Sequence, residues 1–370
     1  MAALALGGSP ARTQAQATTA SAAAGWRLTQ VYGTGQDNYD PTWPGGLAAP
    51  TKTSAWMTWG GCVWPCPAGN TLSVLDHWNG HEWSAVPSRD LLGLSPDQVA
   101  ASSATDVWLL GPVAGSRYYG LRHWNGSKWA KVAAPSWMIY ANGALEYSIY
   151  MADFGPGNLW LFSEGGYVGI TRAYAAHYQD GRWSRSYLPD IPDEAAALSA
   201  NNIWATGEPV GSDSNVVMHW NGRHWTTSAF PKQPVAGYPF GLVATGPDSL
   251  WLAWESSRNT SDQYLLHWAG HRWAKVDLPA GDTVLSMTGD GDGGLWVAAV
   301  GPGKSQPQLF LHWSAGRWQT ARVPFQFTDQ VGQVDELAQI GGTESVWGVG
   351  HVYGAGPNGL NRVAIWRYNP

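Results

Sequence analysis

Three glutamates and one histidine occupy equivalent places in a repeated sequence pattern, each four residues after a recurrent tryptophan. They are Glu164, Glu208, Glu255 and His351. Carboxylates held close together raise one another's pKa, which is one way that a protein makes a general acid at neutral pH. Two carboxylates about 5–9.5 Å apart are also the catalytic pair of glycoside hydrolases. These four residues are therefore the candidate catalytic residues of a hydrolase or lyase.

A second acidic set is expected just before the first strand of several repeats. It consists of Asp97, Asp193, Glu194, Asp282, Asp335 and Glu336. With the three glutamates this makes nine of the 27 acidic residues, so the pattern predicts an acidic rim on one face. Asp193 and Glu336 are the candidate ligand-binding residues of this set. Such a rim attracts cations or amines and is able to hold Ca²⁺; no other cofactor is expected.

Aromatic residues gather in the long segments that connect the repeats. The candidate ligand-binding aromatics are Trp43, Trp137, Tyr140, Tyr147 and Tyr238. Binding residues are often carried by loops on a rigid scaffold. Aromatic faces beside carboxylates that accept hydroxyl hydrogen bonds suit a glycan or another small polar ligand. The opposite face is expected to be basic, because short turns there carry Lys128, Arg182, Arg223, His224, Arg272 and Arg317.

The repeat that positions these residues is built on tryptophan and histidine. The signature His-Trp-Asn-Gly-x-x-Trp recurs at residues 77–83, 123–129, 219–225 and 267–273, with looser copies at 177–183 and 312–318. Asn-Gly between two short apolar runs favours a two-residue hairpin. A second element, small-x-Trp, precedes each signature at intervals of 44 to 52 residues, the length of one four-stranded propeller blade. Its seven tryptophans are Trp56, Trp108, Trp160, Trp204, Trp251, Trp296 and Trp347.

The two ends of the chain complete the last repeat. A seventh copy of the third strand occurs at Ala364-Ile365-Trp366, but the chain stops at Pro370 before a fourth strand. An unpaired fourth strand is expected at about residues 26–31, and its pairing with about 362–368 would remove a sheet edge. We therefore predict an all-β fold. It is a seven-bladed β-propeller of four-stranded antiparallel blades, formed as one domain by residues 26–370.

The recurrent histidines are interpreted as structural. They are His77, His123, His177, His219, His267 and His312. Six histidines spread around a ring cannot converge on one ligand, so we predict hydrogen bonds between strands instead. The recurrent tryptophans are likewise expected to pack in the core. The Asp-Gly-Asp-Gly-Gly stretch at 290–294 is interpreted as a turn, because it lacks the further ligands of a calcium loop.

The alternation of small-x-Trp with the His-Trp-Asn-Gly-x-x-Trp signature resembles secreted bacterial Trp-rich β-propeller repeat proteins over nearly the whole chain. The resemblance implies the fold but no single activity.

Residues 1–25 are rich in Ala, Thr and Ser, and are expected to be a disordered tail or signal-peptide remnant. Cys62 and Cys66 are close enough in sequence for a local disulfide in an oxidising compartment, with two free buried thiols as the alternative. We expect a secreted, extracellular protein.

The composition of the chain limits the classes of partner that are expected. The formal net charge is −6, only 13% of residues are charged, and no basic stripe is present, which argues against nucleic-acid binding. No apolar run approaches the roughly 18 residues of a membrane span. A closed ring needs no partner for stability, so a monomer is expected.

Three functions are consistent with the sequence. The first is a module that binds a glycan or other small polar or cationic ligand at the loop-rich face. The second is the carboxylate-based hydrolase or lyase, with His351 as acid–base partner. The third is a protein-interaction scaffold. Convergence of the glutamates and His351 in one pocket would favour the enzyme, and their spread around the rim would favour binding.

Overall fold

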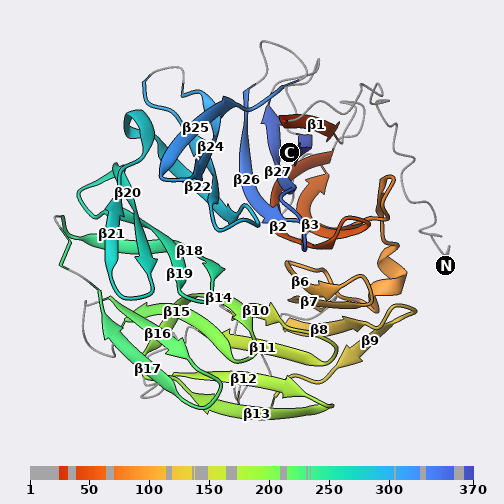
Figure 1. Ribbon diagram of the computed structural model, residues 1–370. Helices are drawn as coiled ribbons and strands as arrows, with labels where there is room; N and C mark the ends of the chain where they lie inside the picture. Colours follow the sequence, from red (N-terminus) through yellow and green to blue (C-terminus); the bar gives the residue numbers. More distant parts are fainter. Residues whose placement is uncertain are drawn as a thin grey trace, which may run out of the picture.

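The computed structural model describes residues 25–31, 39–63, 71–113, 119–135, 137, 149–163, 173–208, 215–230, 232–233, 235–303, 306–325, 331–353 and 362–370. Within these residues the strands form seven four-stranded antiparallel sheets. The sheets are arranged as blades around a centre, with the first strand of each blade innermost and the fourth at the outer edge (Figure 1). The predicted seven-bladed β-propeller is confirmed.

The strands follow one another blade by blade. Blade 1 contains β2 (Tyr39–Thr51), β3 (Ser54–Val63), β4 (Thr71–Trp78) and β5 (Trp83–Ala85). Blade 2 contains β6 (Gln98–Ser103), β7 (Asp106–Pro112), β8 (Tyr119–Trp124) and β9 (Trp129–Val132). Blade 3 contains β10 (Ile149–Asp153), β11 (Asn158–Ser163), β12 (Tyr174–Gln179) and β13 (Arg182–Tyr187). Blade 4 contains β14 (Ile191–Ser199), β15 (Asn202–Glu208), β16 (Val216–Trp220) and β17 (Trp225–Ala229).

The remaining blades have the same design. Blade 5 contains β18 (Gly237–Gly246), β19 (Ser249–Ser256), β20 (Asn259–Ala269) and β21 (Trp273–Val276). Blade 6 contains β22 (Thr283–Gly289), β23 (Leu295–Val300), β24 (Gln308–Ser314) and β25 (Arg317–Arg322). Blade 7 contains β26 (Val331–Gln339), β27 (Val346–Tyr353), β28 (Arg362–Asn369) and β1 (Gly25–Val31). The helices of the described residues include the short 3-10 turns η1 (Ser88–Leu91) and η3 (Pro279–Gly281), and none of them is long and apolar enough for a membrane span.

Blade 7 is completed by the two ends of the chain, as predicted. Strand β1 pairs antiparallel with β28, from Gly25 opposite Asn369 to Val31 opposite Ala364. The Thr29 hydroxyl also donates a hydrogen bond of 2.9 Å to the Ile365 carbonyl oxygen. The N-terminal strand therefore occupies the outer position that the C-terminal segment leaves open.

The tryptophan of each second strand packs between neighbouring blades. Trp108, Trp251 and Trp347 are fully buried. In blades 1 to 6 the indole stacks on the histidine of the adjacent third strand, with ring centroids 3.9 to 4.4 Å apart. Trp251 also contacts Trp313 of blade 6 edge to face, at a centroid distance of 6.0 Å. The repeated tryptophans thus join one blade to the next.

Each recurrent histidine also forms the predicted hydrogen bond between strands. Its Nε2 bonds the side chain of the first residue of the second strand, or in blade 6 that of Asp290 in the turn before it, at 2.5 to 3.3 Å. The six partners are Ser54, Asp106, Asn158, Asn202, Ser249 and Asp290. Blade 7 has Arg367 in place of the histidine, with its guanidinium carbon 4.8 Å from the Trp347 ring centroid. The recurrent histidines are therefore part of the scaffold.

The Asp-Gly-Asp-Gly-Gly stretch is a turn, as interpreted from the sequence. The Asp290 Oδ1 atom accepts hydrogen bonds from the backbone N–H groups of Asp292 at 2.8 Å and Gly294 at 2.7 Å. Its Oδ2 atom lies 2.9 Å from Nε2 of His312. The Asp290 carboxylate thus holds the turn between β22 and β23 and joins it to the third strand.

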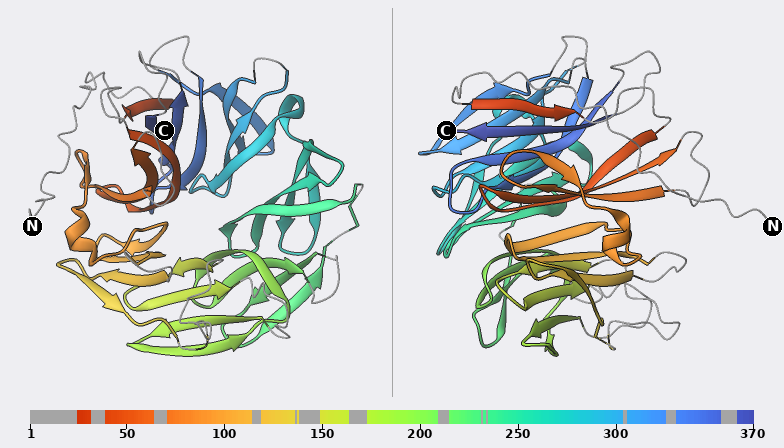
Figure 2. Two further views of the ribbon diagram at one scale, coloured as in Figure 1. Left: turned by 180° about the vertical axis from the view of Figure 1, so that it is seen from behind. Right: turned by 90° about the vertical axis from the view of Figure 1, so that its right-hand side faces the viewer.

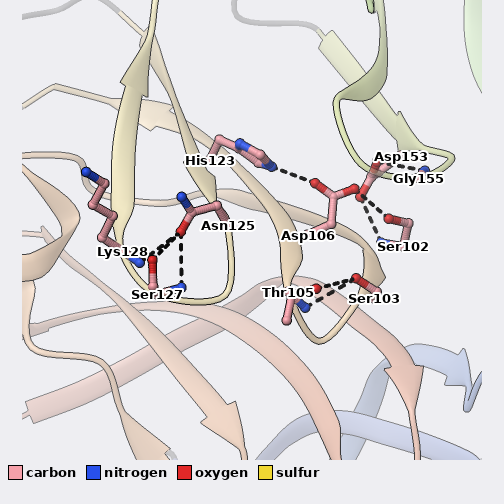
Figure 3. A network of polar contacts seen from close by, with 10 residues as sticks. All are labelled: Ser102, Ser103, Thr105, Asp106, His123, Asn125, Ser127, Lys128, Asp153 and Gly155. Carbon is pink, nitrogen blue, oxygen red and sulfur yellow. Dashed lines mark hydrogen bonds and ion pairs between the residues drawn. The ribbon is translucent and has the colours of Figure 1, made fainter. Parts of the chain in front are cut away.

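The asparagine of the repeat signature organises the turn between the third and fourth strands. In blade 2 the Asn125 Oδ1 atom accepts hydrogen bonds from the N–H groups of Ser127 and Lys128, both at 3.1 Å (Figure 3).

We expect Asn125→Ala to lower the free energy of unfolding by about 1 kcal/mol, because these bonds are solvent-exposed. Asn125→Asp keeps the acceptor oxygen and should lose less. Equilibrium urea unfolding measures both, and an alanine variant as stable as the wild type would contradict this role.

Candidate functional site

The strands run between two faces of the ring (Figure 2). We call the face where second strands end and third strands begin the loop face, and the opposite one the turn face. Glu255 lies near the loop-face end of β19, opposite Tyr238 of β18 and Gln263 of β20. The Tyr238 hydroxyl donates to Glu255 Oε1, and Gln263 Nε2 donates to Oε2 at 2.7 Å. We call these three residues the Tyr238 cluster.

The Tyr238 cluster is held by further bonds. Gln263 Nε2 also donates to the Thr260 carbonyl oxygen at 3.0 Å, and its Oε1 accepts the Val284 N–H at 2.8 Å. Val284 belongs to β22, so this side chain joins blade 5 to blade 6. The hydrogen bond to Glu255 raises the pKa of Tyr238, which keeps the phenol protonated as a donor. The Tyr238 side chain nevertheless remains accessible, with 45% of its surface exposed.

A carboxylate in this arrangement is suited to binding. Its two oxygens offer about four lone-pair sites, so two donors leave room for a ligand hydroxyl. Because both oxygens of Glu255 are already hydrogen-bonded, the group is oriented before a ligand arrives. Gln263 was not identified from the sequence. It lies across the short β19–β20 turn, and its pairing with Glu255 follows from that hairpin register.

His351 lies in a separate group in blade 7. Its Nδ1 is 2.6 Å from Oδ2 of Asp335, and Gln333 Nε2 donates to Oδ1 of the same carboxylate at 2.8 Å. The His351 side chain is buried. Asp335 therefore orients the imidazole, as a carboxylate does in acid–base sites. The predicted catalytic residues Glu255 and His351 thus belong to different hydrogen-bonded groups, in blades 5 and 7.

Glu336 adjoins the His351 group. Burial, together with the negative charge of Asp335, raises the pKa of Glu336 to about 7, while a hydrogen bond from the Leu47 backbone opposes this shift. Glu194 has the same place in blade 4, where its two oxygens accept the N–H groups of Gly241 at 2.8 Å and Leu242 at 2.6 Å. Burial also raises the pKa of Glu194. Each of these glutamates therefore joins its blade to the first strand of the next.

The position of the second acidic set differs from the expectation. Asp97 and Asp282 directly precede β6 and β22, but the other four residues lie within β14 and β26. They are found at β-bulges, where the register shifts between Pro192 and Glu194 and between Val334 and Glu336. A bulge turns a side chain while the strand continues. The first strands therefore begin earlier than the acidic pairs suggested.

Trp137 packs against the outer part of blade 3. Its carbonyl oxygen accepts a hydrogen bond of 2.5 Å from the Tyr174 hydroxyl, and the Arg185 guanidinium carbon lies 4.9 Å from its ring centroid. Asp193 lies in β14 beside Glu194. The Tyr238 cluster lies in blade 5, whereas Trp137 packs on blade 3 and Asp193 belongs to blade 4. The predicted aromatic residues therefore do not all belong to one cluster.

Several predicted residues cannot be placed. Glu164, Tyr140, Tyr147 and Cys66 lie outside the described residues. For Trp43, Cys62 and Glu208 the described part is the backbone, in β2, β3 and β15. The disulfide and the roles of these side chains therefore stay predictions. Among the residues whose positions are described, no group of three or more His, Cys, Asp or Glu side chains is arranged to hold a metal ion.

Comparisons with known proteins support the fold. No protein-family model and no curated protein sequence matches this chain. The structure of YCF48 bound to D1 peptide is 11% identical, covering 93% of this chain and 97% of that chain with a TM-score of 0.57. YCF48 from Cyanidioschyzon merolae is 12% identical, covering 94% and 99% of the two chains with a TM-score of 0.55.

A third similar structure belongs to an enzyme. The GH74 xyloglucanase from Xanthomonas campestris is 12% identical to this chain, with a TM-score of 0.56. The match covers 91% of this chain but 55% of that chain, so this protein spans about half the length of the xyloglucanase. At such identities the similarity shows the β-propeller fold alone.

Proposed function

We propose that this protein is a secreted β-propeller that binds a glycan, or another small polar or cationic ligand, at the loop face. The observation that carries the proposal is the Tyr238 cluster, in which an accessible phenol ring adjoins a carboxylate oriented by two donors. The ring offers an apolar face to the C–H groups of a sugar, and the carboxylate accepts its hydroxyl hydrogen bonds. A site fixed before binding loses less conformational entropy when the ligand arrives.

The comparisons are compatible with this proposal. The GH74 xyloglucanase, by its name, acts on a glycan, and its fold is similar over most of this chain. The YCF48 complex contains a peptide, so a peptide-binding scaffold is the alternative that the same comparisons allow. Export from the cell belongs to the proposal, because it rests on the composition of residues 1–25 and on the two cysteines.

Binding of neutral oligosaccharides by calorimetry tests the proposal, with xyloglucan oligosaccharides as the first probe. We expect Tyr238→Ala and Glu255→Gln each to weaken binding about 10-fold or more. Tyr238→Ala removes the donor to the Glu255 carboxylate, and Glu255→Gln removes the charge of the acceptor. Glu82→Gln, an exposed change in the turn of blade 1, is the matched control and should bind as the wild type does. Unchanged affinity in Tyr238→Ala would refute the site.

An enzymatic function is the second candidate, a hydrolase or lyase. It is favoured by one observation, that His351 is oriented by Asp335 beside Glu336, whose pKa of about 7 suits proton transfer at neutral pH. Incubation of the same oligosaccharides with the wild-type protein tests it through the appearance of new reducing ends. Product formation that disappears in both His351→Gln and Glu336→Gln would favour the enzyme over the binding module.

A further inference from the structure

One exposed turn of blade 4 holds both ends of a side-chain amide. It joins β16 to β17 and consists of Asn221, Gly222, Arg223 and His224. The Asn221 Oδ1 atom accepts the backbone N–H groups of Arg223 at 3.0 Å and of His224 at 3.1 Å. The Asn221 Nδ2 atom donates to Nε2 of the His224 ring at 3.2 Å. The oxygen and the nitrogen of this amide therefore each have a fixed partner within the turn.

The two N–H groups polarise the amide carbonyl. Both donors draw electron density toward Oδ1, which leaves Cγ of Asn221 more electrophilic. They also stabilise the negative charge that develops on Oδ1 when a nucleophile adds to Cγ, as the backbone donors of an oxyanion hole do. The turn thus favours nucleophilic attack on the amide of Asn221.

The nearest nucleophile is the backbone nitrogen of the next residue. Attack of the Gly222 nitrogen on Cγ of Asn221 closes a succinimide ring. Glycine hinders this attack least because it has no Cβ, and its φ of +87° here is one that glycine adopts without strain. The hydrogen bond that closes the turn, from Asn221 N to the His224 carbonyl oxygen, is long at 3.4 Å. The local rotation that brings the nitrogen to Cγ therefore breaks only a weak bond.

His224 faces the atom that must leave. Once the Gly222 nitrogen has added to Cγ, Nδ2 of Asn221 is a basic amine and needs a proton to depart as ammonia. The Gly222 nitrogen gives up one proton in the same conversion. An imidazole accepts and donates protons near neutral pH, which makes it a suitable general acid and base. His224 can therefore pass this proton to the leaving nitrogen.

Blade 2 has the same turn without the imidazole. The Asn125 Oδ1 atom accepts two backbone N–H groups at 3.1 Å, the closing bond from Asn125 N to the Lys128 carbonyl oxygen is also 3.4 Å, and Gly126 has a φ of +88° (Figure 3). Lys128 stands in the place of His224. Within the part of the chain that the structure describes, the bonds of the Asn125 side chain all go to its oxygen. The two turns therefore differ at the leaving nitrogen.

We propose that Asn221 is a site of self-catalysed deamidation, at which the turn converts its own asparagine into aspartate and isoaspartate. The bond between the Gly222 nitrogen and Cγ of Asn221 forms, and the bond between Cγ and Nδ2 breaks. Ammonia leaves with the proton that the Gly222 nitrogen has lost. Water then opens the succinimide at either of its two carbonyl carbons, and no oxidant or reductant takes part.

The modification changes the turn and leaves the blade intact. Trp220 and Trp225 pair on either side of the turn, with ring centroids 5.8 Å apart, so the hairpin is fixed outside the modified residues. Aspartate adds a negative charge beside Arg223 and His224. Isoaspartate also lengthens the main chain by a methylene group, which disturbs the two hydrogen bonds from these residues. Deamidation therefore alters the charge and the shape of one exposed turn.

Peptide mapping by mass spectrometry tests the proposal, on the whole protein incubated at neutral pH in water labelled with heavy oxygen. We expect labelled oxygen to enter the Asn221 peptide about 10-fold or more faster than the Asn125 peptide, an effect within reach of general acid–base catalysis. His224→Gln keeps an acceptor for the amide but carries no proton, so Asn221 should then react as slowly as Asn125. Lys128→His is the matched gain of function and should accelerate the reaction at Asn125.

Equal rates at Asn221 and Asn125 in the wild-type protein would overturn the proposal, and so would an unchanged rate at Asn221 in His224→Gln. Both substitutions are at exposed positions, and circular dichroism before incubation checks that each variant is folded. If His224→Gln does not fold, Lys128→His decides, because a rate at Asn125 that does not rise would refute the role of the imidazole. The difference between the two sites should vanish in urea. A difference that persists there would assign it to the local sequence instead of the folded turn.

Discussion

Replacing Trp26 with alanine is expected to lower the free energy of unfolding by about 3–5 kcal/mol, the loss typical of a large aromatic side chain in a core. The Trp26 ring stacks on Phe310 of blade 6, with centroids 3.6 Å apart and an interplanar angle of 7°. It also meets Trp296 edge to face at 5.3 Å, and lies 5.7 Å from Tyr368 of its own blade. Trp26 therefore fixes the N-terminal strand to blade 6 as well as to blade 7.

Equilibrium urea unfolding, followed by circular dichroism, measures this loss. Arg27→Ala is the matched control on the same strand. Arg27 lies opposite Arg367, whose like charge gives it no favourable pairing, so its removal should change stability by less than about 1 kcal/mol. If Trp26→Ala and Arg27→Ala unfold at the same urea concentration, β1 does not contribute to the closure of the ring.

Stability is expected to fall as the pH rises from about 4 to about 7, and Asp153 is expected to cause about 2–4 kcal/mol of that fall. Asp153 ends β10, and its Oδ2 accepts the N–H of Ser102 in blade 2 at 2.8 Å (Figure 3). Burial, and then the negative charge of Asp106, raise the pKa of Asp153 to about 7 from its ordinary value of 3.8. Asp106 is itself held by hydrogen bonds from Ser102 and His123.

The sign follows from proton binding. Between these two pKa values the folded protein keeps Asp153 protonated while the unfolded chain has released that proton, so folding takes up a proton. The contribution is complete below the unfolded value and is lost as the pH rises through about 7. Glu336, with a pKa of about 7, acts in the same direction.

Unfolding free energies at pH 5 and pH 8 test this expectation. Asp153→Asn keeps an acceptor oxygen but cannot ionise, so the difference between the two pH values should shrink by about 2–3 kcal/mol. Glu336→Gln should reduce it independently, because blades 3 and 7 are not neighbours. If either variant loses as much free energy of unfolding between pH 5 and pH 8 as the wild type does, the carboxyl group that it replaces is already ionised in both the folded and the unfolded protein.

Much of the fold was predictable because each blade repeats the same short-range signals. Hairpin residues, strand lengths and the missing fourth strand are local features, and they sufficed for the blade number and the ring closure. The hydrogen bond of the recurrent histidine could also be inferred from its repetition. Its stacking on the second-strand tryptophan was missed, although the register that places Trp56 opposite His77 follows from the strand lengths.

The candidate site was less predictable, because it depends on contacts between blades. Tyr238 and Glu255 were both selected, yet their direct pairing requires the register of β18 and β19. The bulges that carry Glu194 and Glu336 into contact with the next blade have no local signature in this chain.

The pairing of β1 with β28 has a consequence for the order in which the molecule can be built. Strand β1 can pair only after β28 has been synthesised, since Thr29 and Ile365 are 336 positions apart. Blades 1 to 6 are local in sequence and can form as the chain lengthens, whereas closing so long a loop is slow. Until then β1 has an unpaired, strand-forming edge. The ring can therefore close only after all seven blades have been synthesised, and a variant without β28 would leave β1 unpaired.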